Sequence, residues 1–192
     1  MPKLSKQFYL GNNVVAISKT LLGKYLFTRI DKQLTAGIIT ETEAYAGAND
    51  KASHAYNNRR TKRTEIMFAE GGIAYVYLCY GIHHLFNVVT NTRDQPHAIL
   101  IRAIKPVIGI DIQLKRRNQQ KLSSKTASGP GTVAQALGIK TDHSGADLTG
   151  NKIWLEDRGL LIKEQQIITS PRIGVEYAKE DALLPYRFRI SI

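Results

Sequence analysis

The sequence has little sulfur and no long apolar segment. Its 192 residues include one cysteine, Cys79, so no disulfide can form within the chain. The five histidines do not combine with cysteine in any spacing typical of zinc sites, and we expect no metal and no cofactor. No apolar run approaches the roughly 20 residues that cross a bilayer, so we expect no membrane association.

The N-terminal segment also lacks the features of an export signal. "MPKLSKQFYL" contains no apolar core followed by a small-residue cleavage site. We therefore expect an intracellular protein, in the cytoplasm (nucleoid) of a bacterium or the nucleus of a eukaryote. At this size we expect a monomer.

Acidic residues are scarce relative to basic ones. The chain has 16 Asp and Glu against 27 Lys and Arg, a formal net charge of +11. Such an excess indicates a polyanionic partner such as nucleic acid, although many small basic proteins have none. Here the basic residues gather in two polar segments, "NNRRTKR" (57–63) and "KRRNQQKLSSK" (115–125), which could reach phosphates without disturbing a core.

The apolar pattern predicts an α+β fold in one compact domain spanning residues 1–192. Its sheet is expected to be curved, mainly antiparallel and edged by helices. Helical spacing and glycine or proline positions predict helices near 14–22, 107–117 and 130–138. β-branched and aromatic runs predict strands at 24–31, 34–45, 74–80, 85–91, 98–104, 152–157 and 186–190.

One locally acidic and aromatic stretch stands out in this basic chain, "ETEAYAGANDKASHAY" (41–56). In a regular strand Glu41, Glu43 and Tyr45 share one face. A carboxylate at a strand end that opens into a loop is well placed to act as a general base, because the sheet fixes its position. An isolated glutamate in an edge strand is more often simply solvated, so the interpretation depends on its aromatic neighbours.

A second aromatic stretch, "GGIAYVYLCYGIHHLFNVV" (71–89), predicts a hairpin with Tyr80 and Gly81 at its turn. Tyr75 and Tyr77 lie on one strand face, where Tyr75 is more typical of a core residue. Tyr80 is expected to be exposed at the tip. An exposed ring close to basic segments suggests a wedge that enters a duplex in place of a displaced base.

The order of several motifs resembles that of the alkyladenine (3-methyladenine) DNA glycosylase family. The matching pieces run from about Leu21 to Phe188, and eight of them follow one another at compatible spacing. They are "ETEAYxGxxDxxSHA", "RRTKR" leading to "MF", "AYVYLxYGxxxxxNV", "ILIRAIxP", "SGPGxxxxALGI", "PRIGV" and "YRF".

The resemblance implies a role for each matching residue. Glu43 would activate water, with Arg102 and the backbone carbonyl of Ile173 helping to hold that water. The pocket for the extruded base would be lined by Tyr45, His54, Tyr77 and Asn87. Contacts with DNA would come from the wedge Tyr80 and from Ile82, Arg59, Arg60 and Thr61.

The family activity implied is hydrolysis of the N-glycosidic bond of an alkylated or deaminated purine in double-stranded DNA, leaving an abasic site. Candidate substrates are 3-methyladenine, 7-methylguanine, hypoxanthine and ethenoadenine. The alternative is a non-catalytic module that binds single-stranded nucleic acid, because "GGIAYVYL" partly resembles a stacking strand of an RNA-recognition motif. A nuclease or formyl-transfer enzyme would need acidic metal ligands or a carrier motif, and we find neither.

Overall fold

The computed structural model describes residues 2–192. Within them, six strands form a sheet in the order β3-β4-β5-β2-β1-β6, and β8 pairs with both β2 and β7. Every strand pairing in this sheet is antiparallel. The strands are β1 (Tyr25–Ile30), β2 (Gln33–Tyr45), β3 (Ile73–Cys79), β4 (His83–Thr90), β5 (His97–Ile108), β6 (Ile153–Glu156), β7 (Ile168–Ser170) and β8 (Arg187–Arg189).

The helices are short, and two of the four α-helices begin directly after a glycine. The α-helices are α1 (Lys6–Tyr9), α2 (Val14–Thr20), α3 (Ile110–Arg116) and α4 (Pro130–Leu137). Single 3₁₀ segments lie at Gly47–Asn49, Tyr56–Asn58, Glu65–Phe68, Thr141–His143, Glu164–Gln166 and Glu176–Leu183. Gly138 stops α4 in the left-handed region with φ of 73°, a backbone conformation that costs glycine little.

The long strand β2 gives the sheet its curl. Its pairing with β5 shifts register between Ala36 and Gly37 and again on both sides of Glu41. Such irregularities bend a strand and increase its right-handed twist. The pairing of β2 with β1 stops at Ile38, and β2 pairs instead with β8 from Glu41 to Glu43, so this part of the strand still has a neighbour on each side.

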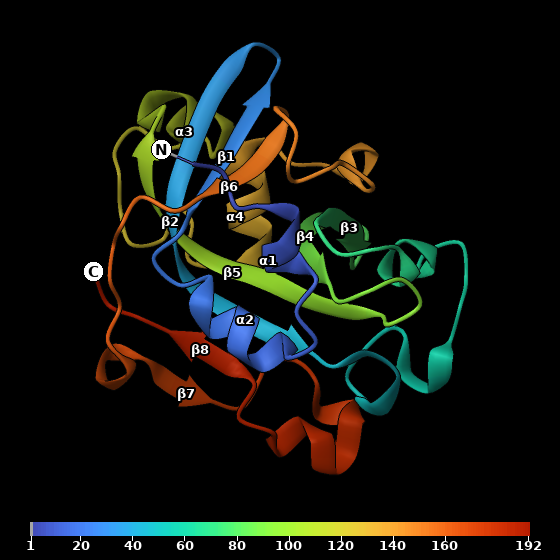
Figure 1. The fold of residues 1–192 in the computed structure, drawn as a ribbon. Coiled ribbons are helices and arrows are strands. Elements are labelled where there is room, and N and C mark those ends of the chain that lie inside the picture. The colour runs from blue at the N-terminus through green and yellow to red at the C-terminus, as the bar shows by residue number, and fades with distance from the viewer. Residues whose placement is uncertain (1) are drawn as a thin grey trace.

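Helices α2 and α4 cover one face of this sheet (Figure 1). The main core lies between them, where Val133 and Leu137 of α4 and Ile17 and Leu21 of α2 join the apolar side chains of the central strands. Because side chains alternate along a strand, Phe86, Val88, Ile99 and Ile101 point toward this core. The residues between them, including Asn87 and Leu100, point to the opposite face.

That opposite face of β3, β4 and β5 is covered by loops. The segment 46–72, coloured cyan to green in Figure 1, lies beside these strands. A smaller apolar cluster forms under it, made of Ala55, Met67, Phe68, Tyr75, Val89 and Ala98.

The predicted α+β fold, a curved antiparallel sheet in one compact unit, is confirmed. The prediction of a helix beginning directly after Pro106 is wrong, because β5 continues through Ile108 and α3 begins only after Gly109. Pro106 pairs with Gly37 at a register shift, and Val107 and Ile108 pack on the cluster of Phe27, Ala36 and Trp154. Gly109, with φ of 62°, then breaks the strand. No helix in the described part of the chain is long and apolar enough to cross a membrane.

Candidate active site

Two hollows lie on opposite faces of the sheet. The first, which we call the aromatic cavity, measures about 510 Å³ and lies on the loop-covered face; its walls include Tyr45, His54, Arg63, Tyr75, Tyr77 and Asn87. The second, which we call the rear groove, measures about 950 Å³ and lies beside α3 and α4; its walls include Asp31, His83, Asp111, Lys115, Arg116 and His143.

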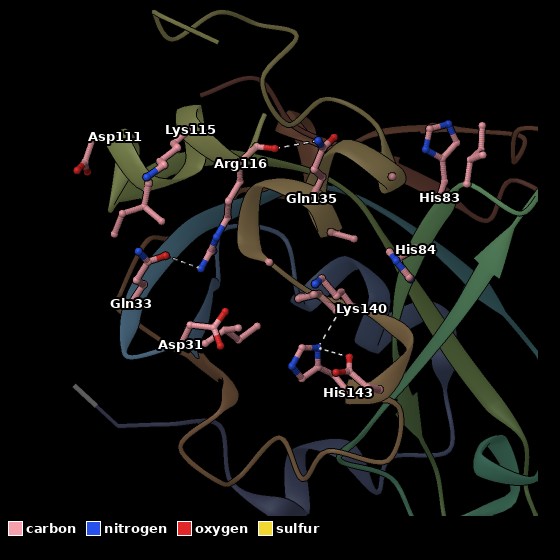
Figure 2. Close-up of a pocket in the computed structure, with 18 residues that line it drawn as sticks. Asp31, Gln33, His83, His84, Asp111, Lys115, Arg116, Gln135, Lys140 and His143 are labelled. Atoms are coloured by element: carbon pink, nitrogen blue, oxygen red, sulfur yellow. Dashed lines mark hydrogen bonds and ion pairs between the residues drawn. The ribbon is translucent and has the colours of Figure 1, made fainter. Parts of the chain in front are cut away.

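The rear groove is the larger hollow, but its charged side chains are spread along its walls. Figure 2 shows Arg116 bonded to Gln33 and Gln135, and His143 bonded to Lys140, while Asp31, Asp111 and Lys115 stand apart. No two of its carboxylates converge on one point with an aromatic neighbour. The chemistry predicted from the sequence gathers instead in the smaller cavity.

Glu43 lies where β2 is held on both sides. It pairs with Leu100 of β5 and with Arg187 of β8, and the next residue, Ala44, donates its N–H to the carbonyl of Tyr186. Its side chain is fully buried. The sheet therefore holds this carboxylate in one position, close to the end of the strand.

Three residues of the cavity wall bind the Glu43 carboxylate. Oε1 accepts the backbone N–H of Ile173 at 2.9 Å and lies 3.2 Å from Nη1 of Arg102. Oε2 accepts the phenol O–H of Tyr45 at 2.9 Å. A carboxylate has about four lone-pair positions, so Oε2 retains capacity for one further donor. Glu43 thus lies directly behind the wall formed by Tyr45, Arg102 and Ile173.

Glu41 contacts different partners from Glu43. Its Oε1 accepts from Nε of Arg102 at 3.0 Å and from Nε of Arg187 at 2.5 Å. Arg102 therefore bridges the two carboxylates, which confirms that Glu41 and Glu43 share one face of β2. With two arginines on one oxygen, Glu41 holds Arg102 in place, while Glu43 faces the cavity residues.

Tyr45 is held from behind by a buried ion pair. Cζ of Arg172 lies 4.8 Å from the ring centroid of Tyr45, and the guanidinium binds both carboxylate oxygens of Asp50, at 2.5 and 2.8 Å. Both charged side chains are almost completely buried. Burial, and then the Glu43 carboxylate, raise the pKa of Tyr45 well above its usual value, so its hydroxyl stays protonated and donates to Glu43.

His54 packs edge-on against two tyrosines across the cavity. Its ring centroid lies 6.2 Å from that of Tyr75 and 4.7 Å from that of Tyr77, and its Nδ1 is 2.9 Å from the hydroxyl of Tyr75. Burial, followed by the positive charges of Arg63 and Arg59, lowers the pKa of His54 to about 4. The imidazole is therefore neutral near pH 7 and can act as a hydrogen-bonding group rather than as an acid.

Asn87 completes the polar part of the cavity. It is buried on β4, where its Nδ2 donates to the carbonyl of Tyr75 at 3.1 Å. This bond fixes the orientation of the amide, and the residue lines the cavity. The arrangement suits a residue that tests the edge of a bound ring.

The tip of the β3–β4 hairpin is apolar and exposed. Tyr80 is 90% exposed and Ile82 is 71% exposed, and the turn closes through a bond from the N–H of Ile82 to the carbonyl of Cys79. Tyr80 and Gly81 both have positive φ, 49° and 72°, as in a type I′ turn. Tyr80 borders the aromatic cavity, whereas Ile82 borders the rear groove. The prediction of an exposed ring at the turn is confirmed.

The basic segment 59–63 lies next to the aromatic cavity but contributes unequally to it. Arg60 is bound by the carboxylates of Glu65 and Asp94, which raise its pKa and occupy its charge. Arg59 and Thr61 lie outside the cavity wall, while Arg63 is part of it. Lys115 and Arg116 of the other basic segment border the rear groove instead, on the opposite face of the sheet.

The structure brings together the residues proposed for catalysis and base binding. Tyr45, His54, Tyr77, Tyr80, Asn87, Arg102 and Ile173 all line one cavity, with Glu43 behind its wall. The sequence interpretation gave no individual role to Arg63, Asp50 or Arg172. Asp50 and Arg172 are part of the quoted motifs "ETEAYxGxxDxxSHA" and "PRIGV", which was the available signal. Tyr75, expected in the core, is both buried and bonded to His54.

Comparisons with known proteins identify the family. A family described as "Methylpurine-DNA glycosylase (MPG)" matches residues 7–191. The chain belongs to the methylpurine-DNA glycosylase family. A relative from Chlamydia felis, named "Putative 3-methyladenine DNA glycosylase", is 46% identical over 98% of this chain and 96% of its own. Relatives with the same name from Alkaliphilus oremlandii and Bacillus mycoides are 40% and 41% identical, covering 98% and 94% of this chain and 96% and 92% of their own.

Membership in the methylpurine-DNA glycosylase family makes this protein a hydrolase of N-glycosyl bonds that acts on DNA. The alternative of a binding module without chemistry is therefore wrong. Between residues 2 and 192, no group of three or more His, Cys, Asp or Glu side chains is placed to hold a metal ion.

Proposed function

We propose that this methylpurine-DNA glycosylase extrudes alkylated or deaminated purines from duplex DNA and hydrolyses their N-glycosidic bond with a water activated by Glu43. The observation that carries the proposal is the burial of Glu43 behind three residues of an aromatic cavity. The proposal treats the chain as a single glycosylase domain that acts as a monomer inside the cell.

In the proposed reaction, a water oxygen attacks C1′ of the sugar as the C1′–N bond breaks and its electron pair leaves with the base. The proton of the water passes to Glu43, whose Oε2 has capacity for a further donor. The carboxylate also stabilises the positive charge that develops on the sugar ring. Arg102 and the carbonyl of Ile173 would hold the water; the contact of Arg102 with Glu43, and the bond from the N–H of Ile173 to the same carboxylate, support that role.

The base would lie between aromatic rings in the cavity. Alkylation at N3 or N7 makes a purine cationic, which weakens the glycosidic bond and lets the base leave with little acid catalysis. Electron-rich rings attract such a cation by about 0.5 to 2 kcal/mol per contact, and Tyr45 and Tyr77 are placed to supply them. His54 and Asn87 would test the edge of the base, and a damaged or mispaired base would be the cheapest to extrude.

Extrusion leaves a gap in the base stack, and Tyr80 would fill it. Its 90% exposure at a turn beside the cavity supports this role, with Ile82 next to it at the tip. Arg59 and Thr61 would contact the flanking backbone. Arg60, which is neutralised by two carboxylates, would contribute more to the shape of its loop than to charge.

A direct assay separates this reaction from its alternatives. The protein is incubated in EDTA with a duplex that contains one hypoxanthine or one 7-methylguanine, and both the released base and the strand breaks are measured. We expect free base at once, strand breaks only after alkali, and no adduct after borohydride. Strand breaks without alkali, or a trapped adduct, would contradict a monofunctional enzyme; activity restricted to one of the two lesions would narrow the proposed substrate range.

A further inference from the structure

The guanidinium of Arg63 lies over the ring of Tyr77, the ring on which the proposed function stacks the base. Its Cζ lies 4.7 Å from the ring centroid of Tyr77, and its Nη2 lies 3.4 Å from Nε2 of His54. No carboxylate pairs with it among the residues that the structure describes. Arg60, three positions earlier, has two carboxylate partners. Arg63 has none within residues 2–192, and its charge is directed into the cavity.

A guanidinium only donates hydrogen bonds, so His54 must accept through Nε2 and carry its proton on Nδ1, next to the hydroxyl of Tyr75. Arg63 and the neutral His54 therefore stabilise each other in the empty cavity. One face of Tyr77 can hold one cation at a time. A cationic purine must then either displace Arg63 or share the cavity with a like charge.

A DNA backbone offers Arg63 a better partner than a phenol ring does. Phosphate oxygens accept paired, charge-assisted hydrogen bonds from the planar guanidinium. Arg63 lies on an exposed loop at the mouth of the cavity, so its flexible side chain can turn outward without moving the core. The contact with Tyr77 and a contact with phosphate exclude each other.

From these contacts we infer that Arg63 is a specificity-determining residue that makes base binding conditional on DNA. It covers the face of Tyr77 in the DNA-free enzyme and leaves that face when it binds a phosphate beside the lesion. The cavity then rejects free cationic bases and admits the same bases when a nucleic acid backbone presents them. This inference rests on the proposed function, in which Tyr77 stacks on the base.

The test measures the affinity for a free cationic base and the affinity for duplex DNA, which the loss of Arg63 should change in opposite directions. The free ligands are 3,9-dimethyladeninium, a permanent cation, and 9-methylhypoxanthine, which is neutral; the DNA is a duplex with one hypoxanthine. We expect Arg63→Ala to bind the free cation about two- to fivefold tighter, while it binds the duplex more weakly with a salt slope reduced by about 0.9. Affinity for the neutral ligand should change less than affinity for the cation.

Arg59→Ala is the matched control, because it removes one arginine of the same segment that lies outside the cavity wall. It should weaken duplex binding and leave the affinity for the free cation within about twofold of wild type, since it uncovers no ring face. Arg63→Lys keeps the charge for phosphate and loses the flat stacking surface, so its duplex affinity should stay close to wild type.

Several results would overturn the inference. Equal losses of free-cation and duplex affinity in Arg63→Ala would mark Arg63 as a structural residue. If neither free ligand binds to wild type or to Arg63→Ala while base excision is normal, uncovering Tyr77 opens no site. Absence of excision by the wild-type enzyme would instead overturn the proposed function, and the inference with it.

Discussion

The aromatic cavity and the rear groove differ in how their charges are used. In the smaller cavity Arg102 and Tyr45 both bind Glu43, and a buried Asp50–Arg172 pair supports Tyr45 from behind. In the larger groove the side chains of Asp111 and Lys115 lie apart, as Figure 2 shows. Volume therefore does not identify the site of chemistry. Buried charges that are paired and hydrogen-bonded do, because each such partner offsets a desolvation cost.

The largest effect is expected at the carboxylates. Glu43→Gln should lower the single-turnover rate of base excision by on the order of 10² to 10⁴, because the amide cannot accept the proton of the attacking water. Binding to the lesion duplex should persist. Rapid-quench measurement of excision, with anisotropy for binding, checks both.

Asp111→Asn is the control from the rear groove, where it exchanges one carboxylate for an amide, as Glu43→Gln does. We expect it to retain the wild-type rate. Similar rates in the two variants would remove Glu43 from the mechanism and cancel the distinction between the two hollows.

The buried ion pair should dominate stability. Asp50→Asn leaves the Arg172 guanidinium buried without its counter-charge, which we expect to lower the free energy of unfolding by about 3 to 5 kcal/mol. Asp142→Asn beside His143 removes an exposed charge near the rear groove and should cost less than about 1 kcal/mol. Urea titrations of both variants test this, and a loss at Asp50 no larger than at Asp142 would contradict it.

The fold could be predicted from the sequence where the pattern is local. The strand pattern of residues 34–45, the turn at Tyr80 and Gly81, and the helix stop at Gly138 each follow from side-chain period or from a required positive φ. The end of β5 could not be predicted in this way, because a proline such as Pro106 is also typical of the first residue of a helix. Its strand conformation depends on Gly37, nearly 70 positions away, and on packing against Trp154.

The sequence predicted which residues belong to the site better than it predicted the contacts between them. The alternation of "ETEAY" put Glu43 and Tyr45 on one face, and the structure brings them within one hydrogen bond. The contact of Arg172 with Tyr45 and that of Arg63 with Tyr77 depend on where two loops fold back. Loop closure of this kind has no periodic signal in a single sequence.

The hairpin tip divides the two hollows, which allows a comparison of neighbouring side chains. Tyr80→Ala should weaken capture of the lesion duplex by about 1 to 3 kcal/mol, the range of one base–aromatic stack. Ile82→Ala should cost less, because Ile82 lies on the side of the rear groove. Single-turnover excision at low enzyme concentration measures both losses. Equal losses would mean that the tip acts as one apolar surface rather than through a single wedge.

The pH dependence of stability should report on the aromatic cavity. His54 has a pKa of about 4 in the folded protein, against an ordinary value of 6.5 in the unfolded chain. Between these values the unfolded state binds more protons, so stability should fall as the pH drops from 6.5 to 4 and stay constant above 6.5. The slope from one histidine is at most about 1.4 kcal/mol per pH unit.

His54→Gln should therefore flatten the curve of unfolding free energy between pH 4 and 6.5, as measured by urea titration at constant ionic strength. His97, whose pKa is lowered by burial, should keep some slope in the variant. A variant curve as steep as that of wild type would show that His54 is not held neutral by its surroundings.

The smallest effect is expected in the rear groove. If Tyr80 enters the duplex beside the aromatic cavity, the nearest phosphates face Arg59 and Arg63, while Lys115 lies on the other face of the sheet. Lys115→Gln should then leave excision unchanged and the salt slope of duplex binding close to wild type, whereas Arg59→Gln should reduce that slope by about 0.9. Anisotropy titrations at several salt concentrations compare the two variants. A reduction of about 0.9 for Lys115→Gln as well would mean that bound DNA extends around the hairpin onto the rear groove, and the two hollows would then serve one binding surface.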